Sequence, residues 1–329
     1  MHQGAEGASA SGGEVRLNPR QRFARYAWGV LIWNVLTILW GAYVRATGAG
    51  AGCGSHWPLC NGVVVPRAAE IETLVELSHR LTSGVALLLI IGLVGWSRRA
   101  FTPGSLPRRG AWVSLILVIV EALIGAGLVL FGWVAKDTSS ARAVVVALHL
   151  VNTLLLLAAL TVTARAAGRS GQATYRWSGR WRLGFAAGLA AVAAMGATGA
   201  VTALGDTLFP VRSLAEGLAA DLASGSHVLI RLRVVHPVLA VIAGGYILAL
   251  AGAARAFGDR ATRTAWWLTA ILLTQGIAGA VNVILLAPVG LQLVHLLLAD
   301  LAWIALVLLV LEVGEAGGPG GAEPSLQDK

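Results

Sequence analysis

The residues with the clearest chemical potential are an acid and an imidazole at the start of a long apolar segment. In Glu76-Leu77-Ser78-His79 the two groups lie three residues apart, which places them on one face of a helix. Ionisable groups are costly in such a segment, so both are candidates for function. A carboxylate beside a cofactor can relay protons or stabilise positive charge. The alternative for Glu76 is a helix N-terminal carboxylate that the helix dipole stabilises.

Three more histidines lie near the start of three other apolar segments, namely His149, His236 and His295. A single histidine in a membrane helix is usually a hydrogen-bonded packing residue, but four at matching positions argue against that reading. Zinc usually recruits cysteine or carboxylate ligands at closer spacing. Two imidazoles on facing helices suit haem iron, and a four-helix bundle can hold the macrocycle. We therefore expect two haem sites, His79/His149 and His236/His295.

Arginines near these segments are candidate contacts for haem propionates at the membrane interface. For one of them, Arg45, snorkelling of the cation to the interface is an equal alternative. The two sites differ, because Arg233 takes the place at the second site that Glu76 has at the first. We therefore assign chemistry to the first site and a fixed electron-transfer haem to the second. The four candidate propionate contacts are Arg45, Arg80, Arg231 and Arg233.

The chain contains only two cysteines, Cys53 and Cys60, and both lie in the first loop between apolar segments. In an oxidising compartment such a pair is typical of a disulfide or a redox dithiol. Two unpaired thiols are the alternative. A metal site would need more ligands, since His56 is the one other candidate nearby.

The composition is that of a membrane protein rather than a soluble domain. Hydrophobic residues make up 57% of the chain, charged residues 12%, and the mean hydropathy is +0.74. The apolar residues form eight segments, each about long enough to cross a bilayer. We expect an all-α polytopic membrane protein with transmembrane helices at 24–46, 77–97, 111–131, 143–165, 183–204, 229–252, 265–286 and 290–312.

The net charge of +9 does not indicate a nucleic-acid partner, because the arginines concentrate in alternate connections. They precede the first helix and lie between helices two and three, four and five, and six and seven, whereas the acids favour the opposite loops. The positive-inside rule therefore places both termini in the cytoplasm. All four histidines then lie near the outer face.

The chain contains signs of an internal repeat. Glu121-x3-Gly125-Ala126 in the third helix matches Gln275-x3-Gly279-Ala280 in the seventh. The histidines also occupy corresponding positions in the two halves of the chain. Small residues of this kind allow close helix approach. We expect two tandem, pseudo-symmetric four-helix bundles. The expected organisation is a disordered cytoplasmic tail at 1–22, a catalytic half at 23–168, a cytoplasmic linker at 169–182, a second half at 183–312 and a cytoplasmic tail at 313–329.

These motifs, in this order, resemble the haem A synthase family over roughly residues 25–312. The matching segments are Gly41-Ala-x-Val-Arg45-x-Thr-Gly48, the loop containing Cys53 and Trp57-Pro58-Leu59-Cys60-Asn61-Gly62, Glu76-x2-His79-Arg80, His149-Leu-Val-Asn-Thr153, Arg231-Leu-Arg233-x2-His236-Pro237, and Asn282 through His295.

The resemblance implies an enzyme that oxidises a methyl group of haem O to a formyl group through successive hydroxylations, giving haem A. Glu76 would be the essential carboxylate, His79 and His149 would hold the substrate haem, and His236 and His295 a resident haem b. The implied setting is the plasma membrane of a prokaryote. The implied partners are the lipid bilayer, haem O synthase, oxidase assembly factors, an unidentified electron donor and, as a homo-oligomer, further copies of the chain.

Other functions are compatible with the same residues. A quinone-linked thiol oxidoreductase would turn over Cys53 and Cys60, whereas a di-haem b electron-transfer or haem-carrier protein would tolerate loss of Glu76. A transporter is less favoured, because the helices lack broken, charged midplane segments. Glu121 departs from the neutral residue that the resemblance predicts. We interpret it as a polar helix–helix contact, with a proton path as the alternative.

Overall fold

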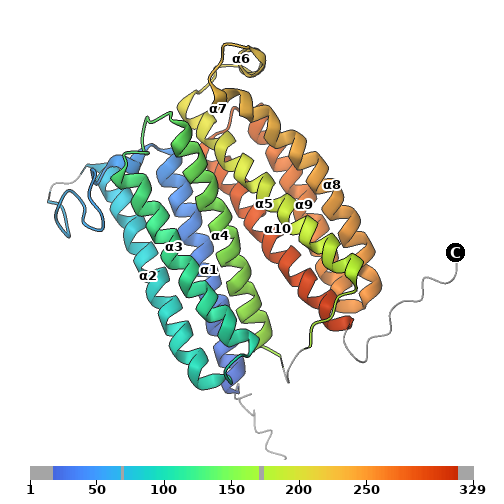
Figure 1. Ribbon diagram of the computed structural model, residues 1–329. Coiled ribbons are helices and arrows are strands. Elements are labelled where there is room, and N and C mark those ends of the chain that lie inside the picture. Colours follow the sequence, from blue (N-terminus) through green and yellow to red (C-terminus); the bar gives the residue numbers. More distant parts are fainter. Residues whose placement is uncertain (1–17, 68–69, 170–173, 318–329) are drawn as a thin grey trace, which may run out of the picture.

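The computed structural model describes residues 18–67, 70–169 and 174–317. In these ranges the regular elements are helices, and eight helical spans are long and apolar enough to cross a membrane, which confirms the predicted class. The spans are α1 (Pro19–Ala46), α2 (Ile71–Ala100), α3 (Leu106–Leu130), α4 (Ser140–Ala167), α5 (Gly179–Leu208), α7 with α8 (Val228–Arg231 and Val235–Ala254), α9 (Asp259–Ile284) and α10 (Val289–Ala316) (Figure 1).

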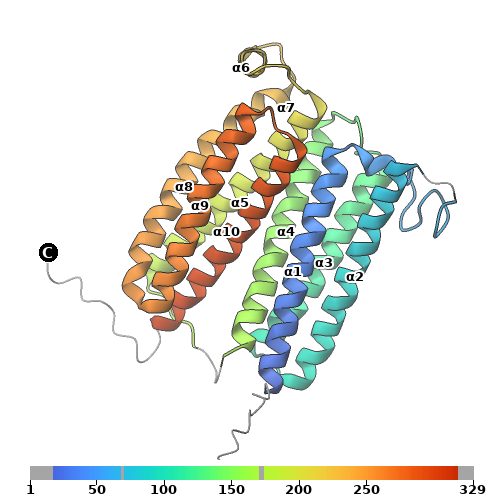
Figure 2. The ribbon, with the colours of Figure 1, turned by 180° about the vertical axis from the view of Figure 1, so that it is seen from behind.

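The spans form two groups that lie side by side. Helices α1 to α4 pack against one another, and α5, α8, α9 and α10 form the second group (Figure 1, Figure 2). Helix α4 joins the groups mainly through α5 and also through α10, α1 contacts α10 and α5, and one continuous apolar core runs through both groups. Helix α1 begins at the end of the molecule where α10 ends (Figure 2). Internal symmetry and cytoplasmic termini stay predictions.

The helices extend beyond the predicted spans, and at the start of α1 a polar cap accounts for the extension. At the start of α1, Asn18 accepts a hydrogen bond from the Gln21 backbone nitrogen at 2.8 Å, and the Gln21 side chain accepts one from the Asn18 backbone nitrogen at 3.0 Å. Pro19 suits the first turn that follows. Residues 19–22 are therefore helical, which corrects their assignment to a disordered tail; residues 1–17 of that tail lie outside the described residues.

Two other predicted boundaries also shift. Helix α5 begins at Gly179, inside the predicted linker 169–182, of which residues 170–173 are outside the described part. Helix α10 continues to Ala316, inside the predicted tail 313–329, because Glu315 pairs with Arg165 and Arg169 across the group boundary.

The sixth span is not one regular helix. Helix α7 leads into a 3-10 turn at Leu232–Val234 before α8 begins at Val235. Pro237 explains the tight turn, because proline lacks an N–H and its ring crowds the carbonyl four residues earlier. A continuous helix at 229–252 was therefore a simplification.

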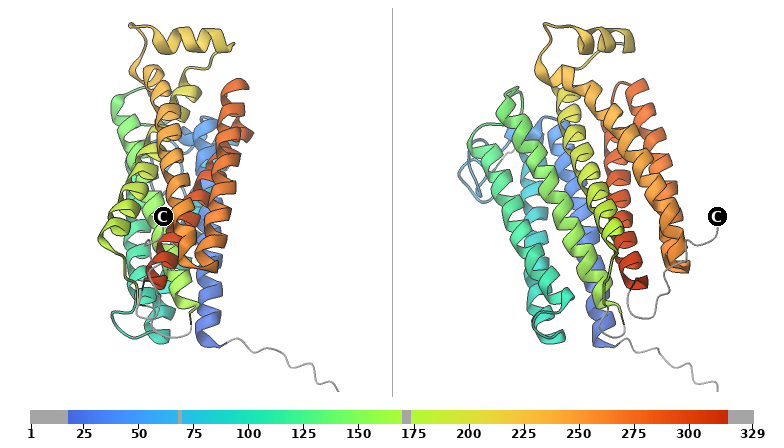
Figure 3. Two further views of the ribbon diagram at one scale, coloured as in Figure 1. Left: turned by 90° about the vertical axis from the view of Figure 1, so that its right-hand side faces the viewer. Right: turned by 45° about the vertical axis from the view of Figure 1, so that its right-hand side comes forward.

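The connection before this span contains helix α6 (Leu214–Leu222), although the sequence analysis predicts no helix between residues 204 and 229. Ser213 caps it by accepting a hydrogen bond from the Glu216 backbone nitrogen at 3.2 Å. Helix α6 lies across the end of the second group, at a steep angle to the spans (Figure 3). Nine residues are too few for the apolar-segment criterion that found the other helices.

Candidate functional site

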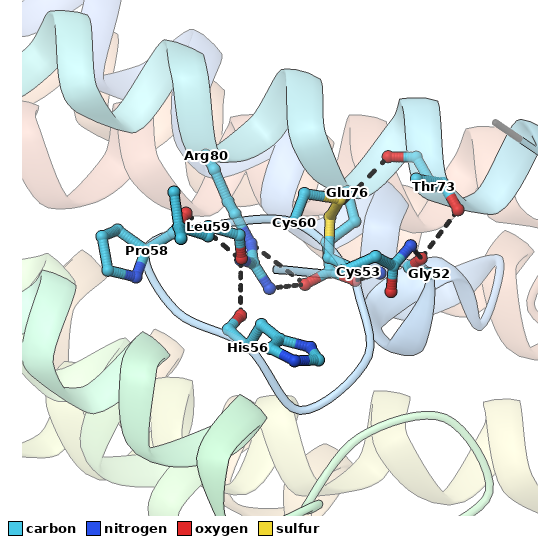
Figure 4. A network of polar contacts seen from close by, with 10 residues as sticks. Gly52, Cys53, His56, Pro58, Leu59, Cys60, Thr73, Glu76 and Arg80 are labelled. Atoms are coloured by element: carbon cyan, nitrogen blue, oxygen red, sulfur yellow. Dashed lines mark hydrogen bonds and ion pairs between the residues drawn. A yellow bond between two sulfur atoms is a disulfide. The ribbon is translucent and has the colours of Figure 1, made fainter. Parts of the chain in front are cut away.

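A loop closed by a disulfide covers the start of α2. The structure joins Cys53 to Cys60, and the backbone nitrogen of Cys53 donates to Glu76 Oε2 at 2.8 Å (Figure 4). Thr73 ties the same loop down by donating to the Gly52 carbonyl at 2.7 Å. Glu76 is only 3% exposed. Since α2 begins at Ile71 and not at 77, Glu76 lies inside the helix, which removes the N-terminal-carboxylate alternative.

Arg80 completes this network from the next turn of α2. Its guanidinium pairs with Glu76 Oε1, and Nη1 donates to the carbonyls of His56 and Leu59 at 2.7 Å each (Figure 4). Both sulfur-bearing residues of the loop are fully buried. The Glu76 carboxylate is thus held in place by one cation and by one backbone N–H. Arg80, a predicted propionate contact, donates its hydrogen bonds to Glu76 and to the loop carbonyls instead.

The first histidine pair lies just below this network. His79 packs its ring against Gly41 of α1, where an added Cβ would lie 2.8 Å from His79 Cε1. The His79 ring therefore fits against α1 only because Gly41 has no side chain. His79 Nδ1 is buried and has no hydrogen-bond partner among the described residues. His79 stands on α2, and its expected partner His149 stands on α4. A partly buried imidazole with an unpaired ring nitrogen is the feature that an iron ligand would show.

His149 has a carboxylate partner on α3. Its Nδ1 lies 3.1 Å from Glu121 Oε1, while Thr153 and Asn152 of α4 donate to the two oxygens of Glu121. The polar helix–helix contact expected at Glu121 is therefore present. A carboxylate on Nδ1 leaves Nε2 of the imidazole available as a ligand and orients the ring.

The second pair is built from α8 and α10. The ring centroids of His236 and His295 are 6.4 Å apart, and the rings are perpendicular. With metal–nitrogen bonds of about 2 Å, two imidazoles on one metal ion place their ring centroids roughly 6 Å apart. His236 Nδ1 donates to the Met195 carbonyl at 3.1 Å, which leaves Nε2 free. Gly199 and Gly279 make room for the rings, since a Cβ at either would lie 2.9 Å from an imidazole carbon.

These observations fit haem better than a simple metal ion. Within the described residues no three His, Cys, Asp or Glu side chains gather as ligands for a metal ion. Paired imidazoles between apolar helices are instead the ligand set of a haem iron. The residues present therefore fit the predicted sites, and the fit is clearest for His236 and His295.

The other predicted propionate contacts connect helices in this structure. Arg45 is held across the group boundary: Nη1 donates to the Ala203 carbonyl at 2.7 Å and to Thr207 at 2.9 Å, and Nη2 donates to Gln292 at 2.9 Å. Arg45 of α1 thus links α5 and α10, and its cation does not snorkel freely. The sequence could not identify these partners, because each is more than 150 residues away.

Arg233 anchors the end of α5 and the short helix α6. It donates to the Gly205 carbonyl at 2.6 Å and pairs with Asp206 at 3.1 Å and with Asp221 at 3.8 Å. Burial raises the pKa of the Asp221 carboxyl, and Arg233 opposes that shift. Arg231 is exposed.

Asp300 is a buried acid that the sequence reasoning did not single out. It lies in α10, is 1% exposed, and neither carboxyl oxygen has a hydrogen-bond partner among the described residues. An acid inside an apolar membrane segment was the signal that could have found it.

Comparison with known proteins identifies the family of the chain. Residues 24–307 match the family described as cytochrome oxidase assembly protein, COX15-CtaA. The chain is 50% identical over 286 residues to a protein named protoheme IX farnesyltransferase in Thermus thermophilus, covering 86% of this chain and 47% of that protein. The chain therefore spans about half the length of these curated relatives.

Shorter matches connect the chain to proteins named heme A synthase. One from Alkalihalophilus pseudofirmus is 42% identical over 104 residues, which is 32% of this chain and 34% of that protein. Another from Exiguobacterium sibiricum is 36% identical over 139 residues, or 42% of this chain and 44% of that protein. The family match covers most of the eight helical spans in which the histidine pairs lie. The chain belongs to the cytochrome oxidase assembly protein family, which is also the family of the haem A synthases.

Proposed function

We propose that this protein is a haem A synthase that oxidises a methyl group of haem O to the formyl group of haem A. The observation that carries the proposal is an asymmetry between two pairs of partly buried imidazoles. At the first pair a buried carboxylate, Glu76, stands three residues before His79 on the same helix. At the second pair the equivalent position holds Arg233, which is engaged with α5 and α6.

In this proposal His79 and His149 bind the substrate haem O, and His236 and His295 bind a resident haem b. The haem b would supply a redox-active iron for electron transfer. In two successive hydroxylations by O2, each step would take two electrons and two protons from an external donor and release one water, and the resulting geminal diol would lose water to give the formyl group. A redox centre that passes electrons from the donor toward the substrate site is therefore chemically appropriate. Gly41, Gly199 and Gly279 leave the space in which the imidazoles stand.

Glu76 is the proposed catalytic carboxylate. Its position one turn before His79 allows it to accept protons that the oxidised carbon loses, or to stabilise positive charge on the substrate. Arg80 and the Cys53 backbone N–H fix the direction of the carboxylate. The disulfide loop therefore acts in this proposal as a support for Glu76. The burial of both cysteines argues against a function in which they undergo thiol–disulfide exchange with a substrate.

The name of the Thermus thermophilus relatives raises a second candidate, farnesyl transfer to protohaem. The match covers 47% of that protein, so the activity in its name can belong to the part that this chain does not match. Transfer from a prenyl diphosphate usually needs carboxylates that hold Mg²⁺ on the phosphates. The described residues contain no such cluster, and the imidazole pairs have no evident use in that reaction. Oxidation of haem O accounts for them better.

The protein is expected in the plasma membrane of a prokaryote, with the haem sites toward the outer face. Support comes from the alternating arginine-rich connections, which favour cytoplasmic termini, and from the disulfide at the opposite end. Haem O synthase, oxidase assembly factors and an electron donor are the proposed partners.

The test is the identity of the haem made in a host that lacks both activities. Membranes with this chain alone, and with a separate source of haem O, would be extracted and the haems identified by chromatography and mass spectrometry. We expect haem A only when haem O is supplied. Haem O appearing in cells that contain this chain alone would instead assign farnesyl transfer.

A further inference from the structure

A basic cavity lies at the end of the spans opposite the histidines. It has a volume of about 530 Å³. Its walls come from the C-terminal end of α4, the first turns of α9 and the last turns of α10, so it joins the two helix groups. The side chains that matter here are Arg165, Arg169, Arg260, Arg263, Trp267 and Glu312.

The charge of this cavity is only partly compensated. Arg165 Nη2 lies 3.1 Å from Glu315, and Arg169 pairs with the same carboxylate. Arg260 and Arg263 are exposed and take part in none of the ion pairs within the described ranges. They interact with the single acid of the wall, Glu312, only at longer range. Two cations therefore face the cavity without a close counter-ion.

The position of the cavity indicates where an anion would come from. Trp267 lines the wall and is 70% exposed on the outside of α9, near the helix end. Tryptophan favours the headgroup level of a bilayer, and arginine pairs bind phosphate through several hydrogen bonds. Basic pockets between transmembrane helices on the cytoplasmic side are suited to lipid phosphates.

We propose that this cavity binds the phosphate headgroup of an anionic membrane lipid, with Arg260 and Arg263 as phosphate ligands and Trp267 packed against the lipid. Because α4 belongs to the first group and α9 to the second, a bound lipid would connect the two. This site does not depend on the haem chemistry proposed above.

The test measures lipid binding to the full chain, purified in detergent with its haems. Phosphatidylglycerol, phosphatidylcholine and inorganic phosphate would be titrated separately and followed by native mass spectrometry and by thermal unfolding. The variant is Arg260→Gln with Arg263→Gln. The matched control is Arg98→Gln with Arg99→Gln, two arginines of α2 at the same end of the molecule that do not line the cavity.

We expect phosphatidylglycerol to bind and to raise the unfolding temperature, with phosphatidylcholine much weaker. The double variant at 260 and 263 should bind phosphatidylglycerol roughly 20- to 30-fold more weakly, since each arginine near a membrane surface contributes about a factor of five. The α2 control should bind as the wild type does. Trp267→Ala should also weaken binding, whereas Trp266→Ala, whose ring stacks on Arg255 instead, should not.

Three results would overturn the proposal. The first is equal binding of the two lipids, and the second is unchanged binding by the double variant. The third is a stabilisation by inorganic phosphate as large as that by phosphatidylglycerol, which would assign the cavity to a soluble anion.

Discussion

Arg80→Ala is expected to destabilise the disulfide loop and α2. The side chains of Arg80 and Glu76 are only 12% and 4% exposed. Removing one partner of a buried pair typically costs about 3–5 kcal/mol, because the other charge stays buried without compensation. After the substitution Glu76 would keep one strong partner, the Cys53 backbone N–H at 2.8 Å. We therefore expect a loss of about 3–5 kcal/mol in the free energy of unfolding.

The assay is chemical unfolding in detergent micelles, together with the rate at which a protease cleaves the loop at 54–67. Arg67→Ala is the matched control, since Arg67 lies in the same loop, is exposed, and takes part in none of the ion pairs within the described ranges. In a double-mutant cycle with Glu76→Ala, the two losses should be less than additive by up to about 3 kcal/mol. Unfolding of Arg80→Ala within about 0.5 kcal/mol of the wild type, or additive losses, would refute this reasoning.

Three further outcomes are expected. Gly41→Ala places a methyl group 2.8 Å from His79 Cε1 and should lower the haem bound per chain, measured by the pyridine haemochrome spectrum. Gly29→Ala is the control, because an added Cβ there meets nothing within 4 Å, and equal haem content in the two variants would contradict the packing. Cys53→Ser opens a short covalent loop and should lower the free energy of unfolding by roughly 2–3 kcal/mol, while an unchanged unfolding midpoint would show that the disulfide adds nothing. Glu121→Gln keeps hydrogen bonding between α3 and α4 but loses the charge, so we expect the free energy of unfolding to fall by about 1–2 kcal/mol. A larger fall than that of Glu121→Leu would contradict this reasoning.

Much of the fold could be predicted from the sequence, because an apolar segment of bilayer length has few alternatives to a helix. The positions of the histidines along their helices followed from the same segments. Helix ends were less predictable, since they depend on polar caps such as Asn18 and on ion pairs such as that of Glu315. Helix α6 was missed because it is short and lies outside the spans.

The candidate site was predictable residue by residue but not as a set of contacts. The residue types and their spacing in the sequence identified Glu76 as a candidate. The structure shows in addition that Arg80 and the disulfide loop hold its carboxylate in place. The partners of Arg45 are distant in sequence, so no local pattern could indicate that it joins the two helix groups. Asp300 is a different case: the sequence shows an acid in an apolar segment, but only the structure shows that the acid is buried.

The most direct test of the proposed division of labour is the haem extracted from wild type and from Glu76→Gln, each expressed with a source of haem O. If the first site oxidises haem O with the help of Glu76, the wild type yields haem A, and the variant retains haem O together with haem b. Haem A at the wild-type level in Glu76→Gln would contradict the role of this carboxylate and favour chemistry elsewhere in the chain.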